Sequence, residues 1–160
     1  MKEIIIQPLA RKHINAVANI WHDGWHDAHA ALVPGELTAI RTMEAFGARV
    51  TDELHMIRVA GPVGAPIGMC IRKGNELYQL YVAPAGRGTG LAGNLMQDAE
   101  AAMAASGVDM AWLGCAIGNT RAARFYEKQG WQLAREDVVE LVGSDAPFPL
   151  NLWVYEKSLG

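Results

Sequence analysis

The sequence predicts a mixed α/β fold in one domain, residues 1–160, with a mostly antiparallel central sheet, one parallel pair of strands within it, and flanking helices. Three short strand candidates, 54–60, 66–72 and 76–82, are joined by brief glycine-containing connections, which force antiparallel neighbours. A complete helix pattern separates the third from the strand at 109–117, so these two strands should run parallel. A length of 160 residues with 51% hydrophobic content suits one well-buried domain and is too short for two ordinary ones.

The elements before this section follow from branched residues and helical periodicity. Residues 2–8 contain three consecutive isoleucines and predict a first strand. A helix comes next, because apolar residues recur at the spacing of an amphipathic face until Pro34 and Gly35 end the pattern. Its apolar stripe consists of Ile14, Val17, Trp21, Trp25 and Ala28. Residues 36–46 predict a second helix.

The C-terminal half continues with two helices and three strands. Leucines and alanines at helical spacing predict a helix from Leu91 that ends near Gly107. After the strand at 109–117, Asn119 caps a second helix, which stops at Gly130. The remaining elements are strands at 131–142 and 150–159 with a loop between them at 143–149.

Charge and hydropathy exclude several classes of partner. The net charge of −3 comes from 14 Lys+Arg against 17 Asp+Glu without long runs of one sign, which leaves no electrostatic footprint for nucleic acid or an anionic membrane. No apolar stretch approaches the roughly 20 residues that span a bilayer, and the first residues lack the regions of a signal peptide. We therefore expect a cytoplasmic protein with no nucleic-acid and no membrane partner.

The two cysteines, Cys70 and Cys115, both lie inside apolar strand-like runs. In such runs a free cysteine behaves as a small buried hydrophobe rather than as a disulfide partner. A catalytic thiol is not expected, because no activating Lys, Arg or His adjoins either residue.

A glycine-rich turn between a strand and a helix is the most informative feature of the chain. Gly86, Gly88 and Gly90 allow backbone conformations closed to other residues, and the helix that begins at Leu91 presents its first free N–H groups at the same point. The helix dipole adds partial positive charge, and Arg87 adds a full one. The turn therefore predicts an anion site, and a pyrophosphate fits it better than a carboxylate.

The segment Gly88-Thr89-Gly90-Leu91-Ala92-Gly93 also satisfies the dinucleotide fingerprint of a Rossmann enzyme. That fingerprint should follow the first strand of a parallel sheet and be answered by an acid at the end of the next strand. Here antiparallel strands precede the turn, and the nearby acid, Asp109, comes before the next strand. A P-loop is excluded because no Gly-Lys-Ser/Thr follows the turn.

Two motifs in this half of the chain resemble the signatures of one family. The first is Leu77-Tyr78-Gln79-Leu80-Tyr81-Val82, then Pro84, then Arg87-x-x-Gly90-x-Ala92. The second is Asn119-x-x-Ala122-x-x-Phe125-Tyr126-Glu127-Lys128-x-Gly130-Trp131. Both are similar, in order and spacing, to motifs of the GNAT superfamily of acyl-coenzyme A-dependent acetyltransferases. The order of elements is also that of the superfamily, so the resemblance extends over nearly the whole chain.

The resemblance implies a detail of the fold and a cosubstrate. In that family the two parallel strands splay apart, and the strand before the glycine-rich turn is bulged, which exposes backbone groups to the coenzyme. Acetyl-CoA is the implied cosubstrate, with no metal. Carried over by position, its binding residues are Leu80, Tyr81, Val82, Arg87, Gly88, Thr89, Gly90, Leu91, Ala92, Asn119 and Tyr126.

The same comparison implies a role for each part of this set. Backbone amides of residues 87–92 would bind the pyrophosphate, while Leu80, Val82 and Asn119 would meet the pantetheine arm. Tyr126 would offer its hydroxyl to the coenzyme sulfur as general acid. A phenol with a pKa of about 10 protonates a departing thiolate only if it is held within hydrogen-bond distance, and otherwise Tyr126 is a packed helix residue.

The implied reaction is direct transfer of the acetyl group to a primary amine, without an acyl-enzyme, so a base must remove a proton from the acceptor's ammonium. Glu76 is the first candidate, because it begins the strand that leads to the acetyl site and a carboxylate can act directly or through water. The alternative for Glu76 is a solvated carboxylate in a hairpin. Strand alternation alone does not decide which face of the sheet it occupies.

Three histidines, His22, His26 and His29, have the spacing i, i+4 and i+7, which puts their imidazoles along one side of the predicted helix. Three such nitrogens can ligate zinc. The only acids nearby are Asp23 and Asp27, and the family does not depend on a metal, so no metal site is expected. The first helices commonly flank the acceptor pocket in this fold, which makes one of these histidines, or Trp21 or Trp25, a candidate for contact with the acceptor, although the apolar stripe favours a core position for the two tryptophans.

The acceptor itself is not identified by any sequence feature. A small-molecule amine and the amine of a peptide or protein both remain open, although a polyamine is disfavoured because the chain has no concentrated acidic run. A non-catalytic module that senses acyl-coenzyme A is the alternative function, and a Rossmann-type enzyme is a distant third. A homodimer is common for this architecture, but no pattern indicates which surface would pair.

Overall fold

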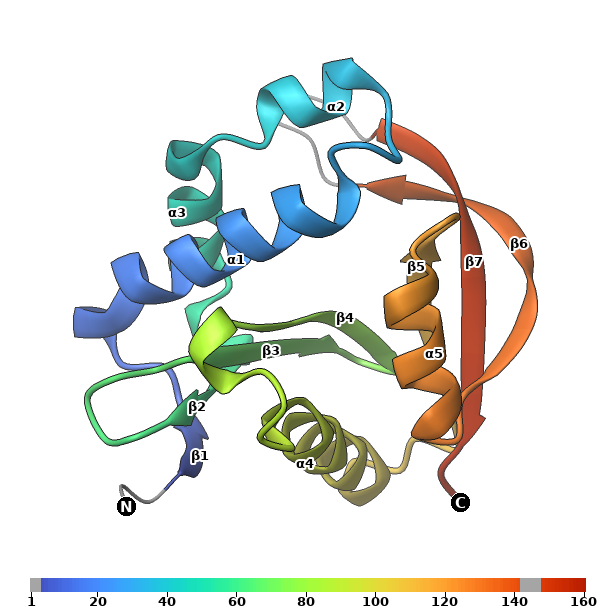
Figure 1. Cartoon of the computed structure of the whole chain (residues 1–160). Helices are drawn as coiled ribbons and strands as arrows, with labels where there is room; N and C mark the ends of the chain where they lie inside the picture. The colour runs from blue at the N-terminus through green and yellow to red at the C-terminus, as the bar shows by residue number, and fades with distance from the viewer. Residues whose placement is uncertain (1–3, 142–147) are drawn as a thin grey trace.

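The computed structural model describes residues 4–141 and 148–160, and its centre is a seven-stranded sheet in the order β1-β2-β3-β4-β5-β7-β6 (Figure 1). All neighbouring strands are antiparallel except β4 and β5, which run parallel. The strands are β1 (Ile5–Pro8), β2 (Ile57–Gly61), β3 (Gly68–Lys73), β4 (Glu76–Val82), β5 (Met110–Ala116), β6 (Gln132–Leu141) and β7 (Phe148–Ser158). The predicted mixed α/β class is confirmed, and this sheet excludes the parallel, doubly wound sheet of a Rossmann enzyme.

Helices cover both faces of the sheet, with α1 and α3 on one face and α4 on the other (Figure 1). The side chains of β3 show this division, because Met69 and Ile71 pack in the core under α1 and α3, whereas Cys70 packs under α4. None of the described helices is long and apolar enough to cross a membrane. The helices are α1 (Ile14–His29), α2 (Gly35–Ile40), α3 (Met43–Asp52), α4 (Leu91–Ala105) and α5 (Thr120–Lys128).

The prediction of one helix over residues 36–46 is wrong, because the chain leaves the helix at Arg41 and begins α3 at Met43. Thr42 caps the new helix, since its hydroxyl accepts a hydrogen bond of 3.1 Å from the N–H of Ala45. The predicted strand at 54–60 also starts late, after a 3-10 turn over Leu54–Met56. Parts of three other predictions, at residues 2–3, 142 and 143–147, lie outside the described residues.

The parallel strands β4 and β5 are in register only at one end of β4. Of the described residues, Glu76 and Trp112 form the single registered pair between them, and the N–H of Trp112 donates to the carbonyl of Asn75 at 3.0 Å. Strand β4 also has a bulge, because Ile71 and Arg72 of β3 face Gln79 and Leu77, which leaves Tyr78 without a partner. The carboxyl halves of β4 and β5 are therefore free to line a cavity.

Candidate active site

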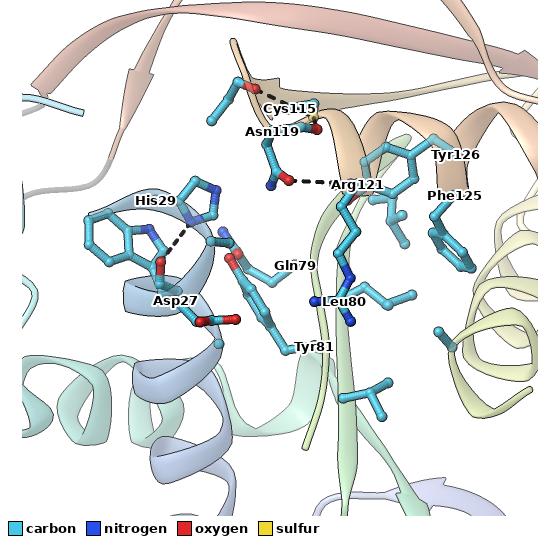
Figure 2. Close-up of a pocket in the computed structure, with 18 of the residues that line it drawn as sticks. Asp27, His29, Gln79, Leu80, Tyr81, Cys115, Asn119, Arg121, Phe125 and Tyr126 are labelled. Atoms are coloured by element: carbon cyan, nitrogen blue, oxygen red, sulfur yellow. Dashed lines mark hydrogen bonds between the residues drawn. The ribbon is translucent and has the colours of Figure 1, made fainter. Parts of the chain in front are cut away.

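A cavity of about 520 Å³ opens between the carboxyl halves of β4 and β5. Segments that are far apart in the sequence line it, among them α1, β4, the glycine-rich turn before α4, and α5 with its cap. Figure 2 shows the side chains of Asp27 and His29 facing those of Arg121 and Tyr126 across the cavity, with Gln79 and Tyr81 between them. The predicted pyrophosphate turn and the predicted acid thus share one cavity.

The glycine-rich turn presents an uncapped helix start to this cavity. Gly88 and Gly90 have φ angles of 75° and 82°, in the left-handed region that favours glycine. Gly90 is the N-cap of α4 and offers no side chain, and the first turn of the helix contains no acid. The first N–H groups of α4 and its dipole are therefore available to an anion.

Some of the other residues of the turn line the cavity, and one of them stabilises the loop. Arg87, Leu91 and Ala92 line the cavity, as the two glycines do. Thr89 is absent from the lining, and its hydroxyl donates to the carbonyl of Gly86, which holds the turn in shape. Arg87 lies 3.7 Å from the carboxylate of Asp27, and both side chains are exposed, so this ion pair is weak and easily exchanged for another anion.

Strand β4 supplies Leu80, Tyr81 and Val82 to the cavity wall. Helix α1 crosses this strand closely, because a Cβ atom on Gly24 would lie 2.5 Å from Cδ1 of Tyr81. The close packing of α1 on β4 therefore requires glycine at position 24. In the sequence this residue indicated only a locally weakened helix. Burial raises the pKa of Tyr81, so its phenol is neutral at physiological pH.

Helix α5 brings Asn119 and Tyr126 to the opposite wall. Asn119 caps the helix as predicted, with its side-chain oxygen accepting from the N–H of Ala122 at 3.2 Å. The ring of Tyr126 packs 6.0 Å from that of Tyr155, and its hydroxyl has no hydrogen-bond partner in residues 4–141 and 148–160. Burial raises the pKa of Tyr126, so the hydroxyl keeps its proton at neutral pH.

Glu76, the predicted base, lies at the opposite end of β4, where the strand pairs with Trp112. It is not among the residues that line the cavity. Burial raises the pKa of Glu76 to about 7, against the opposing effect of Lys73 and with a smaller contribution from Glu53. The structure therefore gives Glu76 a pKa suited to a base but does not bring it together with Tyr126.

The three histidines of α1 have three different environments. The imidazole of His22 contacts Asp23 at 2.9 Å, and His26 donates through Nε2 to the carbonyl of Arg41 at 2.6 Å. Within the described part of the chain, no three His, Cys, Asp or Glu side chains are grouped to hold a metal. Of the three, only His29 lines the cavity.

His29 is held in one orientation, because its Nδ1 donates to the carbonyl of Trp25 at 3.0 Å. Its Nε2 is then the free acceptor of the neutral ring. Burial lowers the pKa of His29, the hydrogen bond to Trp25 opposes this effect, and the charge of Arg41 adds to it. A neutral imidazole with a free nitrogen in a cavity can accept a proton.

Sequence reasoning missed Arg41, Arg49 and Tyr78, all of which line the cavity. No spacing or motif distinguishes Arg41 and Arg49, because they reach the cavity only through the packing of α2 and α3 against α1 and β4. Tyr78 stands inside the first motif, but strand alternation alone did not decide that it faces the cavity. Cys115 also lines the cavity, but burial raises the pKa of its thiol to about 12. Both cysteines are free and buried, as expected.

Comparisons with known proteins agree with this geometry. The model of the acetyltransferase (GNAT) family matches residues 15–131 of the chain. An uncharacterized N-acetyltransferase of Mycobacterium tuberculosis (strain ATCC 25618 / H37Rv) is 36% identical over 109 residues, which is 65% of this chain and 67% of that protein.

Solved structures with the same fold extend over almost all of the chain. A GCN5-related N-acetyltransferase from Rhodopseudomonas palustris has a TM-score of 0.74 at 21% identity, covering 99% of this chain and 98% of that one. The PaiA N-acetyltransferase from Thermoplasma acidophilum, solved in complex with coenzyme A, has a TM-score of 0.70 at 19% identity, covering 98% and 99%. On the family match and the shared fold, this chain is an N-acetyltransferase and belongs to the acetyltransferase (GNAT) family.

Proposed function

We propose that this enzyme transfers the acetyl group of acetyl-coenzyme A directly to a primary amine. The observation that carries the proposal is the single cavity in which an uncapped helix start, the free half of β4 and the hydroxyl of Tyr126 meet. Direct transfer requires both substrates in one cavity at the same time, and it needs no nucleophilic side chain. The buried thiol of Cys115, with its pKa of about 12, agrees with a reaction that uses no acyl-enzyme.

The residues present fit the coenzyme. The open N–H groups that follow Gly90 and the exposed guanidinium of Arg87 suit a pyrophosphate, and no acid in the first turn of α4 opposes it. Leu80 and Val82 offer apolar side chains to the pantetheine arm, and the backbone of β4 that β5 does not pair offers hydrogen-bonding groups to it. Acetyl-coenzyme A supplies a thioester-activated acetyl group when bound. The coenzyme A complex of PaiA supports this choice through the shared fold.

Tyr126 is the proposed general acid. It lines the cavity from α5, keeps its proton because burial raises its pKa, and has a hydroxyl that no described residue engages. Such a group can donate a proton to a departing sulfur, which removes the negative charge that would otherwise develop there.

Two residues are proposed alternatives for the base. His29 is favoured, because it lines the cavity, is kept neutral by burial and has Nε2 free while Nδ1 is bound to Trp25. Glu76 remains the second candidate on its pKa of about 7, and it would need a water chain to reach the amine from its place outside the lining. The acceptor is a small-molecule, peptide or protein amine.

Calorimetric titration of the purified protein with acetyl-coenzyme A, with a nicotinamide dinucleotide as control, tests the cosubstrate. We expect stoichiometric binding of the thioester alone. Incubation with an amine panel should then release free coenzyme thiol and increase the mass of one amine by an acetyl group. Binding without any turnover across the panel would favour a coenzyme sensor, and no binding at all would refute the proposed function.

A further inference from the structure

Two arginines, Arg41 and Arg49, line the cavity away from the glycine-rich turn. Arg41 follows α2, and Arg49 lies in the last turn of α3, so both reach the cavity from the wall opposite α5. Arg41 is only 4% exposed and is the one charged residue buried to this degree in the described ranges. A buried arginine is rare in proteins unless it is paired, so its presence calls for a partner.

Both side chains are held in place by their surroundings. The carbonyl of Arg41 accepts the hydrogen bond from His26, and its guanidinium carbon lies 5.8 Å from the ring centre of Trp25. The guanidinium carbon of Arg49 lies 4.3 Å from the ring centre of Trp21, and its Nη2 donates to the hydroxyl of Tyr78. These contacts anchor the backbone of Arg41 and place both guanidinium groups beside aromatic rings.

The contacts leave both charges uncompensated. No carboxylate in residues 4–141 or 148–160 forms an ion pair with Arg41 or Arg49, and the Nε atom of each is buried without a hydrogen-bond partner. Burial and the charge of Arg49 lower the pKa of Arg41 to about 10, which still leaves it protonated at neutral pH. A buried cation and a half-buried one without a carboxylate partner cost stability, and an anion bound between them would offset that cost.

We propose that the acceptor amine also carries an anionic oxyacid group, a carboxylate or a phosphate, which binds Arg41 and Arg49. This inference rests on the proposed acetyl transfer. The planar guanidinium matches either anion with paired hydrogen bonds. His29 lies on the same wall, which puts the proposed base beside the anion site, as an acceptor with amine and anion close together requires. Val33, Leu37 and Leu150 give that wall an apolar part for the rest of a small molecule.

Acceptor pairs matched in shape, of which one member carries the anion, test the inference when the rates are compared at equal concentrations of the neutral amine. We would compare leucine, methionine and phenylalanine with their carboxamides, and O-phosphoethanolamine with ethanolamine, by the release of free coenzyme thiol. We expect the anionic member of at least one pair to have a kcat/KM about tenfold higher or more, the effect of one charge-assisted hydrogen bond. The amino-acid arm and the phosphate arm distinguish the two sources of anion.

Variants assign the preference to the arginines. Arg41→Gln should remove the preference for the anionic member, mainly through KM, and Arg41→Lys should retain part of it. Arg49→Lys repeats the test at the second position if Arg41→Gln does not fold. Arg124→Gln is the matched control, because Arg124 is exposed on α5 and is not among the residues that line the cavity.

Calorimetry separates the possible failures. Equal or better use of the neutral members by an enzyme that binds acetyl-coenzyme A would overturn the anionic acceptor and leave acetyl transfer intact. The same holds if no anionic member is consumed, or if Arg41→Gln keeps the full preference. An enzyme that does not bind the coenzyme would overturn the proposed function, and this inference with it.

Discussion

At the scale of single residues, the hydroxyl of Tyr126 can be removed with little change in packing. Tyr126→Phe keeps the ring contacts with Phe125 and Tyr155 and loses only the proton donor. General acid catalysis contributes roughly 100-fold or more, so we expect kcat to fall by about that factor. Coenzyme affinity, measured by calorimetry, should remain nearly unchanged, because the turn before α4 is untouched.

Tyr155→Phe is the matched control for this variant. The hydroxyl of Tyr155 donates to Glu127 at 2.9 Å, and Tyr155 is not among the residues that line the cavity. Its loss should affect stability slightly and kcat little. Equal turnover by Tyr126→Phe and the unaltered enzyme would remove Tyr126 from the mechanism.

The pH dependence of turnover distinguishes the two proposed bases. A general base accepts a proton only in its unprotonated form, so activity falls as the pH drops through its pKa. The pKa of His29 is lowered by burial, which puts its acid limb below the ordinary histidine value of 6.5. We expect His29→Gln to lower kcat by roughly 100-fold and to abolish this limb. The ratio of variant to unaltered profiles cancels the titration of the amine itself.

The pH profile of Glu76→Gln tests the alternative base. Because the pKa of Glu76 is about 7, a catalytic role for this carboxylate would produce an acid limb near pH 7. With His29 as the base, the profile of Glu76→Gln should keep the shape of the unaltered enzyme. A limb near pH 7 that disappears in Glu76→Gln and persists in His29→Gln would assign the base to Glu76.

At the scale of elements, the crossing of α1 over β4 positions the cavity wall, and Gly24 permits it. Alanine is the better helix former by about 1 kcal/mol, but a Cβ atom there would lie 2.5 Å from the Tyr81 ring. Displacing that ring should outweigh the helical gain, so we expect Gly24→Ala to lower the free energy of unfolding by about 1–3 kcal/mol. Coenzyme binding should weaken as well, because Tyr81 lines the cavity.

Gly47→Ala in α3 is the control for this effect. A Cβ atom at Gly47 meets nothing within 4 Å, so only the helical preference remains and the variant should gain up to about 1 kcal/mol. Denaturant unfolding of both variants measures the two effects. A stabilised Gly24→Ala would show that α1 shifts over β4 without strain, contrary to the close packing.

At the scale of the whole molecule, the parts that sequence reasoning predicted are those with local causes. The glycine-rich turn, the Asn119 cap and the antiparallel middle strands depend on residues within a few positions of one another. The break at Arg41 was missed because Thr42 competes as a cap inside a segment with good helical periodicity. Local patterns therefore predicted the turn and the helix start that line this side of the cavity.

The opposite wall depends on contacts between distant segments. His26 meets the carbonyl of Arg41, and Arg49 meets Tyr78 of β4, only after α1 and α3 have packed on the sheet. The same packing decides which of the three histidines of α1 faces the cavity. Of these three, His29 lines it. The spacing of residues in the sequence does not indicate these contacts between distant segments. The places of Arg41 and Arg49 in the cavity wall could therefore not be predicted.

The free energy of unfolding should also depend on pH through Glu76, which is partly buried beside the ion pair of Lys73 and Glu53. Its pKa rises from 4.5 to about 7 on folding, because burial disfavours the carboxylate. The associated stability is fully present below pH 4.5 and is lost as pH rises to about 7, since only the unfolded chain ionises freely in between. Glu76→Gln does not titrate, so its free energy of unfolding relative to the unaltered enzyme should increase between pH 4.5 and about 7.

Urea unfolding at several pH values measures this difference, with Glu136→Gln on exposed β6 as control. Parallel curves for Glu76→Gln and the unaltered enzyme would mean that Glu76 ionises as freely in the fold as in the unfolded chain.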